Sequence, residues 1–134
     1  MTYLLDSNAC IGWLRQSQPK LVARIKQERP TDIVICSVVV GELIYGAERS
    51  GTAHRANNLL RVEQLRRQFI SLPFDDSAAE EYGKVRAHLT VLGTPIGPND
   101  LMIAAIALAN KLILVTHNTA EFSRVPGLSI EDWQ

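Results

Sequence analysis

Short apolar runs that alternate with longer helical patterns constrain the fold of this chain more than any other feature. Residues 3–5, 33–36 and 112–115 are short and almost wholly apolar, as is typical of buried strands. Strands that are separated by helices pair in parallel, and the helices then cover both faces of the sheet. The sequence therefore predicts one α/β domain, with helices expected at residues 7–15, 20–28, 37–49, 53–70, 77–92 and 99–109 and a short polar helical turn after the last strand.

Size, charge and cysteine content favour a single soluble domain over residues 1–134. Lys and Arg number 14 and so do Asp and Glu, so a polyanion must bind through a local patch or through metal ions. Cys10 and Cys36 lie among apolar residues, and we expect two free buried thiols. No stretch resembles a signal peptide, and the apolar run at 101–109 is shorter than the roughly 20 residues of a membrane span. A cytoplasmic protein without membrane contact is expected.

Acidic residues occur where the predicted strands end. Asp6 directly follows the first strand, and Glu42 lies early in the helix that follows the second strand. Asp100 opens the apolar helix after the loop "GTPIGPN", and Glu121 follows the third strand. Ligands of parallel sheets bind beyond the carboxyl ends of the strands. The sequence therefore places four carboxylates near one edge of the sheet.

Each acid also has an ordinary structural explanation. Asp6 could cap the helix that follows it, and Asp100 could favour the positive end of its helix dipole. Glu42 and Glu121 could simply be solvated. Together, however, carboxylates that converge in one cleft repel one another, and a divalent cation normally holds them ionised. The three histidines are scattered, so an oxygen-only donor set favours Mg²⁺ or Mn²⁺ over zinc.

Four segments carry these acids in order along the chain, namely "LLDSN", "SVVVGELIYGA", "GTPIGPNDLMIAAIA" and "LVTHNTAEF". In combination they resemble the PIN-domain ribonucleases, and most closely the VapC toxins of bacterial toxin–antitoxin pairs. The resemblance covers nearly the whole chain. It implies a PIN-like domain with a central parallel sheet, Mg²⁺- or Mn²⁺-dependent endoribonuclease activity, and inhibition by a co-expressed VapB-type antitoxin. A homodimer and a structured RNA substrate, often tRNA, are implied as well.

By motif, the resemblance assigns the first three acids of the family to Asp6, Glu42 and Asp100. The fourth position is open, because many members have an acid where this chain has Asn118. Glu121 matches the acid of a later pair. Either Glu121 ligates a metal, directly or through water, or Asn118 supplies a neutral oxygen to a weakened second metal site.

Hydrolysis by metal-activated water requires carboxylates whose geometry is fixed. We expect Asp6, Glu42 and Asp100 to hold a first metal ion, while Glu121 and Asn118 help with a second ion or orient the attacking water. Hydrogen bonds from polar neighbours would fix these carboxylates, and the candidates are Asn8, Ser37, Asn99, Thr116 and Asn118. Ser37 and Asn99 are also expected to cap the helices beside them. Ser7 stands where the family commonly has Thr, and it keeps the hydroxyl.

An arginine-rich segment is the best candidate for phosphate contacts with RNA. Five arginines occur between residues 49 and 67 against one acid, Glu63. Ordinary solvated helix charge is an equally weighted alternative, and the same arginines would also suit acidic residues of an antitoxin. The five are Arg49, Arg55, Arg61, Arg66 and Arg67.

One rival interpretation is a PIN-like scaffold that binds RNA or protein with little or no catalysis. Its support is Asn118 in place of an acid, whereas the three intact acids favour the ribonuclease. A related DNA flap-type nuclease would normally be larger and carry a helical module that grips DNA. The sequence therefore favours the toxin ribonuclease.

Overall fold

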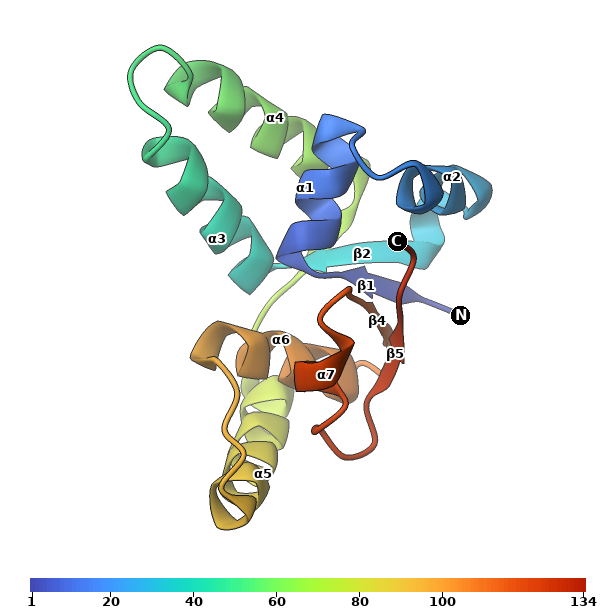
Figure 1. Ribbon diagram of the computed structural model, residues 1–134, viewed down its shortest axis with the longest axis vertical. Helices are drawn as coiled ribbons and strands as arrows, with labels where there is room; N and C mark the ends of the chain where they lie inside the picture. The colour runs from blue at the N-terminus through green and yellow to red at the C-terminus, as the bar shows by residue number, and fades with distance from the viewer.

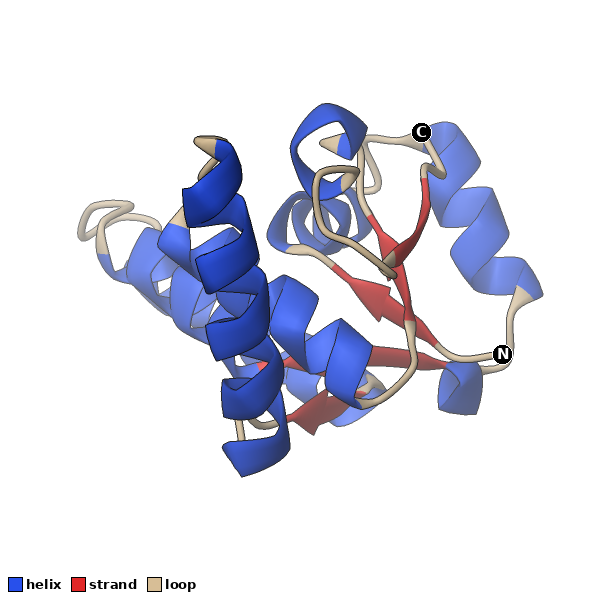
Figure 2. Cartoon of the chain, turned by 90° about the horizontal axis from the view of Figure 1, so that it is seen from below, coloured by secondary structure: helices blue, strands red, loops and turns tan.

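The computed structural model describes all 134 residues, and a parallel five-stranded sheet runs through its centre (Figures 1 and 2). Strands β1 (Tyr3–Leu5), β2 (Ile33–Cys36) and β4 (Ile113–Val115) confirm the three predicted strands. The strand order is β3-β2-β1-β4-β5, and every neighbouring pair is parallel. The predicted α/β fold is confirmed.

Two edge strands were not predicted from the sequence. β3 (Ile70–Leu72) pairs with β2, and β5 (Ser129–Glu131) pairs with β4. Residue 70 was expected to end a helix, but helix α4 stops two residues earlier, at Gln68. Edge strands are covered less than central ones, and the Ile70 side chain is 64% exposed. A short, half-solvated strand lacks the continuous apolar run that marks a buried one.

Helices cover both faces of the sheet (Figure 1). The first four helices lie on one face and the last three on the other, because the chain reverses its direction across the sheet between β3 and β4. A 3₁₀ turn precedes β2 at Pro30–Asp32. The helices are α1 (Ser7–Arg15), α2 (Pro19–Gln27), α3 (Ser37–Glu48), α4 (Arg55–Gln68), α5 (Asp76–Leu92), α6 (Pro98–Ala109) and α7 (Thr119–Phe122).

The helix caps differ from expectation at two of three positions. Asp6 caps α1, as its position between strand and helix suggested. Cys36 is the N-cap of α3, so Ser37 is the first helical residue, and its hydroxyl donates a hydrogen bond to the carbonyl of Leu72 in β3. Helix α6 is capped by Gly97 rather than Asn99, because Pro98 is well suited to the first helical position.

The apolar core is built on the central strand. Leu4 of β1 is fully buried and pairs with Val34 on one side and Leu114 on the other. We therefore expect Leu4→Ala to lower the free energy of unfolding by about 2–5 kcal/mol, through lost apolar burial and the cavity left behind. Chemical denaturation would measure the loss. Val91→Ala is the control, because Val91 is 86% exposed and its truncation should cost less than about 1 kcal/mol.

Both cysteines are free and completely buried, as expected. Burial raises the pKa of the Cys36 thiol to about 11 and that of Cys10 well above its ordinary value, because desolvation penalises the thiolate. Both side chains are thus protonated at neutral pH. No helix combines the length and hydropathy that a membrane span requires.

Candidate active site at the carboxyl edge of the sheet

The structure brings the four acids to one edge of the sheet. Asp6 follows β1, and Glu42 lies in the second turn of α3. Asp100 lies in the first turn of α6, and Glu121 lies in α7. Burial raises the pKa of Asp100, and the charges of Glu121, Glu42 and Asp6 raise it further, so the four carboxylates share one electrostatic environment.

Asp6 is the most buried of the four, with only 6% of its surface exposed. One carboxylate oxygen accepts a hydrogen bond of 2.8 Å from the backbone N–H of Ala9, which is the capping interaction of α1. Burial raises the pKa of Asp6, and hydrogen bonds from the Thr116 side chain and from Ala9 partly offset that rise. The charge of Glu42 raises it further. Asp6 therefore has a structural role and is also held in an environment that penalises its negative charge.

Ser7 fixes the position of Glu42. Its hydroxyl donates a hydrogen bond of 2.8 Å to Oε1 of Glu42, across 35 positions of sequence. Because Ser7 directly follows Asp6, the end of β1 carries one acid and orients a second. The sequence indicates this hydroxyl through its position beside Asp6 and through the family resemblance, but it does not indicate its partner.

Asp100 and Glu121 form the second half of the group. A Cβ placed on Gly97 would lie 3.8 Å from an oxygen of each carboxylate, so both acids flank that glycine. The backbone N–H of Gly97 donates to Oε1 of Glu121 at 2.9 Å, and the Asn118 side-chain amide donates to Oε2. Burial and the neighbouring carboxylates, Glu121 foremost, raise the pKa of Asp100 to about 6.

Among the five polar neighbours proposed from sequence, two contact the acids. Thr116 bonds to Asp6, and Asn118 bonds to Glu121. The other three do not hydrogen-bond to any of the four carboxylates, which differs from expectation. Ser37 is bonded to β3, whereas Asn8 and Asn99 are exposed in the first turns of their helices.

The donor set suits a hard divalent cation, because oxygen ligands alone are present and a positive charge would relieve their repulsion. The four carboxylates lie too far apart to bind one metal ion together, since no three acidic, histidine or cysteine side chains are grouped closely enough to hold a metal ion. Two of the acids instead take hydrogen bonds from Ser7, Asn118 and Gly97. Binding of a metal would therefore require the carboxylates to move closer together.

A cavity of about 210 Å³ opens beside Glu42, between α1, α3 and α4. Its walls combine apolar residues such as Leu14 and Leu43 with the guanidinium groups of Arg15 and Arg61. Cationic side chains therefore stand close to one acid of the group. The cavity is one place where a segment of a polyanion or of another protein chain can approach the acidic edge.

The five candidate arginines are not equivalent. Arg55 is paired with Glu48 at 2.6 Å and Arg66 with Glu63 at 3.6 Å. Arg49 lies over the Tyr45 ring and donates to its hydroxyl. Arg49, Arg61 and Arg67 form no ion pair, and the exposed side chains of Arg61 and Arg67 also lack the aromatic partner that Arg49 has.

The parallel sheet with acids along its carboxyl edge is the arrangement of a PIN domain, and the PIN domain family model matches residues 3–128. The tRNA(fMet)-specific endonuclease VapC of Salmonella typhimurium is 39% identical over 133 residues, which are 99% of this chain and 98% of that protein. Ribonuclease VapC2 of Haemophilus influenzae is 34% identical over the same shares. The chain therefore belongs to the PIN-domain family and, within it, to the VapC ribonucleases.

Solved structures agree with this assignment. DNA-bound VapBC from Salmonella typhimurium is similar with a TM-score of 0.92 and 38% identity, covering 100% of this chain and 99% of that one. VapBC2 from Rickettsia felis, bound to a DNA fragment from its promoter, has a TM-score of 0.90 and 31% identity, with 100% of both chains covered. The whole chain thus has the VapC fold.

Proposed function

We propose that this protein is the ribonuclease of a toxin–antitoxin pair and that it cleaves RNA with Mg²⁺ or Mn²⁺ at the acidic edge of its sheet. The observation that carries the proposal is the convergence of four carboxylates on a VapC fold, where burial and the neighbouring acids raise the pKa of two of them, Asp6 and Asp100. An uncompensated group of this kind is costly to the folded protein, so a site of this composition is well explained by a bound cation.

Asp6, Glu42 and Asp100 would hold the cation, and Glu121 is the better candidate for the fourth position. The Asn118 side-chain amide donates a hydrogen bond to Glu121 and so positions that carboxylate. When bound at this place, a divalent cation would lower the pKa of its bound water and neutralise the charge of the phosphoryl oxygens. The chain contributes the fixed geometry, since Ser7 orients Glu42 while Thr116 and Ala9 orient Asp6.

The substrate we propose is tRNA, because the Salmonella relative is named as a tRNA(fMet)-specific endonuclease. The exposed, unpaired Arg61 and Arg67 would contact the phosphates. A VapB-type antitoxin is the expected inhibitor, since the similar solved structures are VapBC complexes. We also expect a homodimer, which light scattering would detect, and a cytoplasmic location.

Cleavage of total bacterial RNA by the purified protein, freed of any partner, tests the proposal. Reactions with Mg²⁺, with Mn²⁺ and with EDTA would be compared, and new 5′ ends would be sequenced. We expect cuts at one or a few tRNA sites, each leaving a 5′-phosphate and each absent with EDTA. RNA that is bound but never cut would instead favour a non-catalytic scaffold. The observation that supports this alternative is Asn118, which stands where many relatives have an acid.

Ser7→Ala should lower the cleavage rate by about 10- to 100-fold, because Glu42 then loses the hydrogen bond that orients it. The rate at saturating and limiting Mn²⁺ would be measured, and the larger loss is expected at limiting metal. Ser123→Ala is the control, since that hydroxyl caps the carbonyl of Ala120 instead. Equal rates for the two variants would show that Ser7 does not position Glu42.

A further inference from the structure

A second cavity, of about 260 Å³, lies along α1 next to the acidic edge. It runs from Asn8, two residues after Asp6, to Arg15 at the end of the helix, a rise of roughly 10 Å. Its other walls are Gln18 in the loop after α1, His117 after β4 and Gln134. Only one of its eight lining residues is hydrophobic. The proposed cleavage mechanism assigns no role to this cavity.

His117 is held in one orientation at the cavity wall. Its Nδ1 lies 2.9 Å from a carboxylate oxygen of Asp132, which is positioned to fix the proton on Nδ1. With Nδ1 directed at Asp132, Nε2 is left to hydrogen-bond to a ligand. Asp132 lies close enough to the acidic group for its charge to raise the pKa of Asp6. The His117 side chain is 66% exposed, so a ligand reaches the ring directly.

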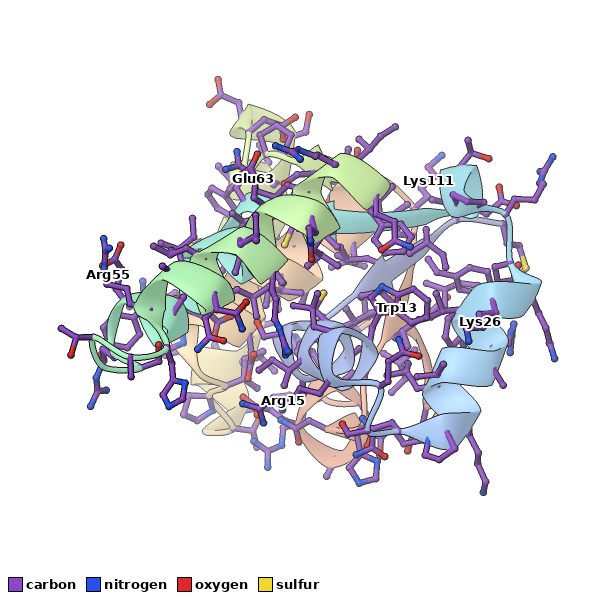
Figure 3. The ribbon with its side chains drawn as sticks, turned by 90° about the horizontal axis from the view of Figure 1, so that it is seen from above. Trp13, Arg15, Lys26, Arg55, Glu63 and Lys111 are labelled. Atoms are coloured by element: carbon purple, nitrogen blue, oxygen red, sulfur yellow. The ribbon has the colours of Figure 1, made fainter.

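The side chains in the wall suit a nucleobase better than a phosphate. The amides of Asn8, Gln18 and Gln134 each offer a donor and an acceptor, as the edges of bases do. Arg15 is the single cationic side chain in the wall, and the nearby negative charge of Asp132 disfavours an anionic ligand such as a phosphate. Arg15 takes part in none of the ion pairs of the chain. It lies at the end of α1, on a different side of the helix from Trp13 (Figure 3).

We propose that this cavity binds one unstacked base of the RNA next to the cleaved phosphodiester and so sets the sequence preference of cleavage. His117 and Gln18 hydrogen-bond to the edge of the base, and the planar guanidinium of Arg15 stacks on its face, which are the usual contacts to bases in RNA loops. The inference rests on the proposed ribonuclease function and adds the determinant of its selectivity.

Cleavage of an RNA loop library, randomised around the cut site, tests the inference. The wild-type protein should prefer one base at one flanking position by roughly 5- to 100-fold, the discrimination that a pair of hydrogen bonds provides. His117→Ala and Gln18→Ala should each reduce that preference to less than about 3-fold, and the slower cleavage that remains should still depend on Mn²⁺. His88→Ala, at an exposed histidine of α5, is the matched control and should keep the preference.

Binding in EDTA separates a base from a phosphate as the ligand. An RNA oligonucleotide with an abasic residue at the preferred position keeps the phosphate but lacks the base. The wild-type protein should bind it about 5-fold or more weakly than the intact RNA, whereas His117→Ala should bind both equally. Equal wild-type affinities, or a preference that survives both substitutions, would overturn the inference. A wild-type protein that neither cuts nor binds RNA would contradict the proposed function itself.

Discussion

Asp6→Asn is expected to reduce RNA cleavage by more than about 100-fold while the fold stays intact. Loss of a polar group that only orients a ligand costs up to about 100-fold, and Asp6 is proposed as a ligand itself. Asparagine caps helices as well as aspartate does, so the hydrogen bond from Ala9 is retained. The substitution removes a buried charge, and we therefore expect unfolding to occur at the same or a higher temperature in metal-free buffer.

A matched control exists in α5. Asp75 caps that helix in the same way, with the backbone N–H of Ala78 donating to its carboxylate at 3.0 Å, but it lies outside the acidic group. Asp75→Asn should leave kcat/KM within about 2-fold of the wild type, since it changes a cap without touching the site. If Asp6→Asn retains more than about a tenth of the wild-type kcat/KM, Asp6 is a structural cap and nothing more.

Asp100→Asn should stabilise the metal-free protein at pH 7 even though it abolishes cleavage. The pKa of Asp100 is raised from 3.8 to about 6 by burial and by the carboxylates around it. The folded state then holds this proton more tightly than the unfolded state, so stability falls as pH rises from about 4 to about 6. After allowance for solvent screening of this half-buried group, the loss at pH 7 is about 1–2 kcal/mol, and the neutral amide avoids it.

Thermal unfolding in EDTA between pH 4 and pH 8 measures this effect. The variant should unfold several degrees above the wild type at pH 7, and the difference should shrink toward pH 4, which is below the folded-state pKa of Asp100 and close to its ordinary value of 3.8. Mn²⁺ should raise the unfolding temperature of the wild type more than that of the variant. Glu80→Gln, at an exposed acid of α5, is the control. A difference that does not change with pH would exclude charge repulsion as its cause.

The sequence predicted the three central strands because each is buried on both faces and is therefore continuously apolar. β3 and β5 were missed because half-exposed edge strands carry no such run, and Ser71 and Glu131 interrupt any apolar pattern. Without β3, one side-chain contact was also missed. The hydrogen bond of Ser37 to Leu72 depends on β3, so its partner was not predictable without that strand.

The convergence of the four acids was predictable for a topological reason, since parallel strands end at the same edge. The contacts that hold the acids were not. Ser7 and Glu42 are 35 residues apart, and only the packing of α1 beside α3 brings them together. The pairing of His117 with Asp132 likewise depends on β5 lying next to β4, which no local pattern indicated.

The central claim is that the acidic group binds a divalent cation that RNA cleavage requires, and Mn²⁺ titration of the wild type and of Asp6→Asn tests it most directly. Mn²⁺ binding by calorimetry and the cleavage rate would be measured at the same concentrations. We predict that the wild-type rate rises in step with Mn²⁺ occupancy and is lost with EDTA, while the variant neither binds nor cleaves. Wild-type cleavage that continues in EDTA, or Mn²⁺ binding that is unchanged in Asp6→Asn, would contradict the claim.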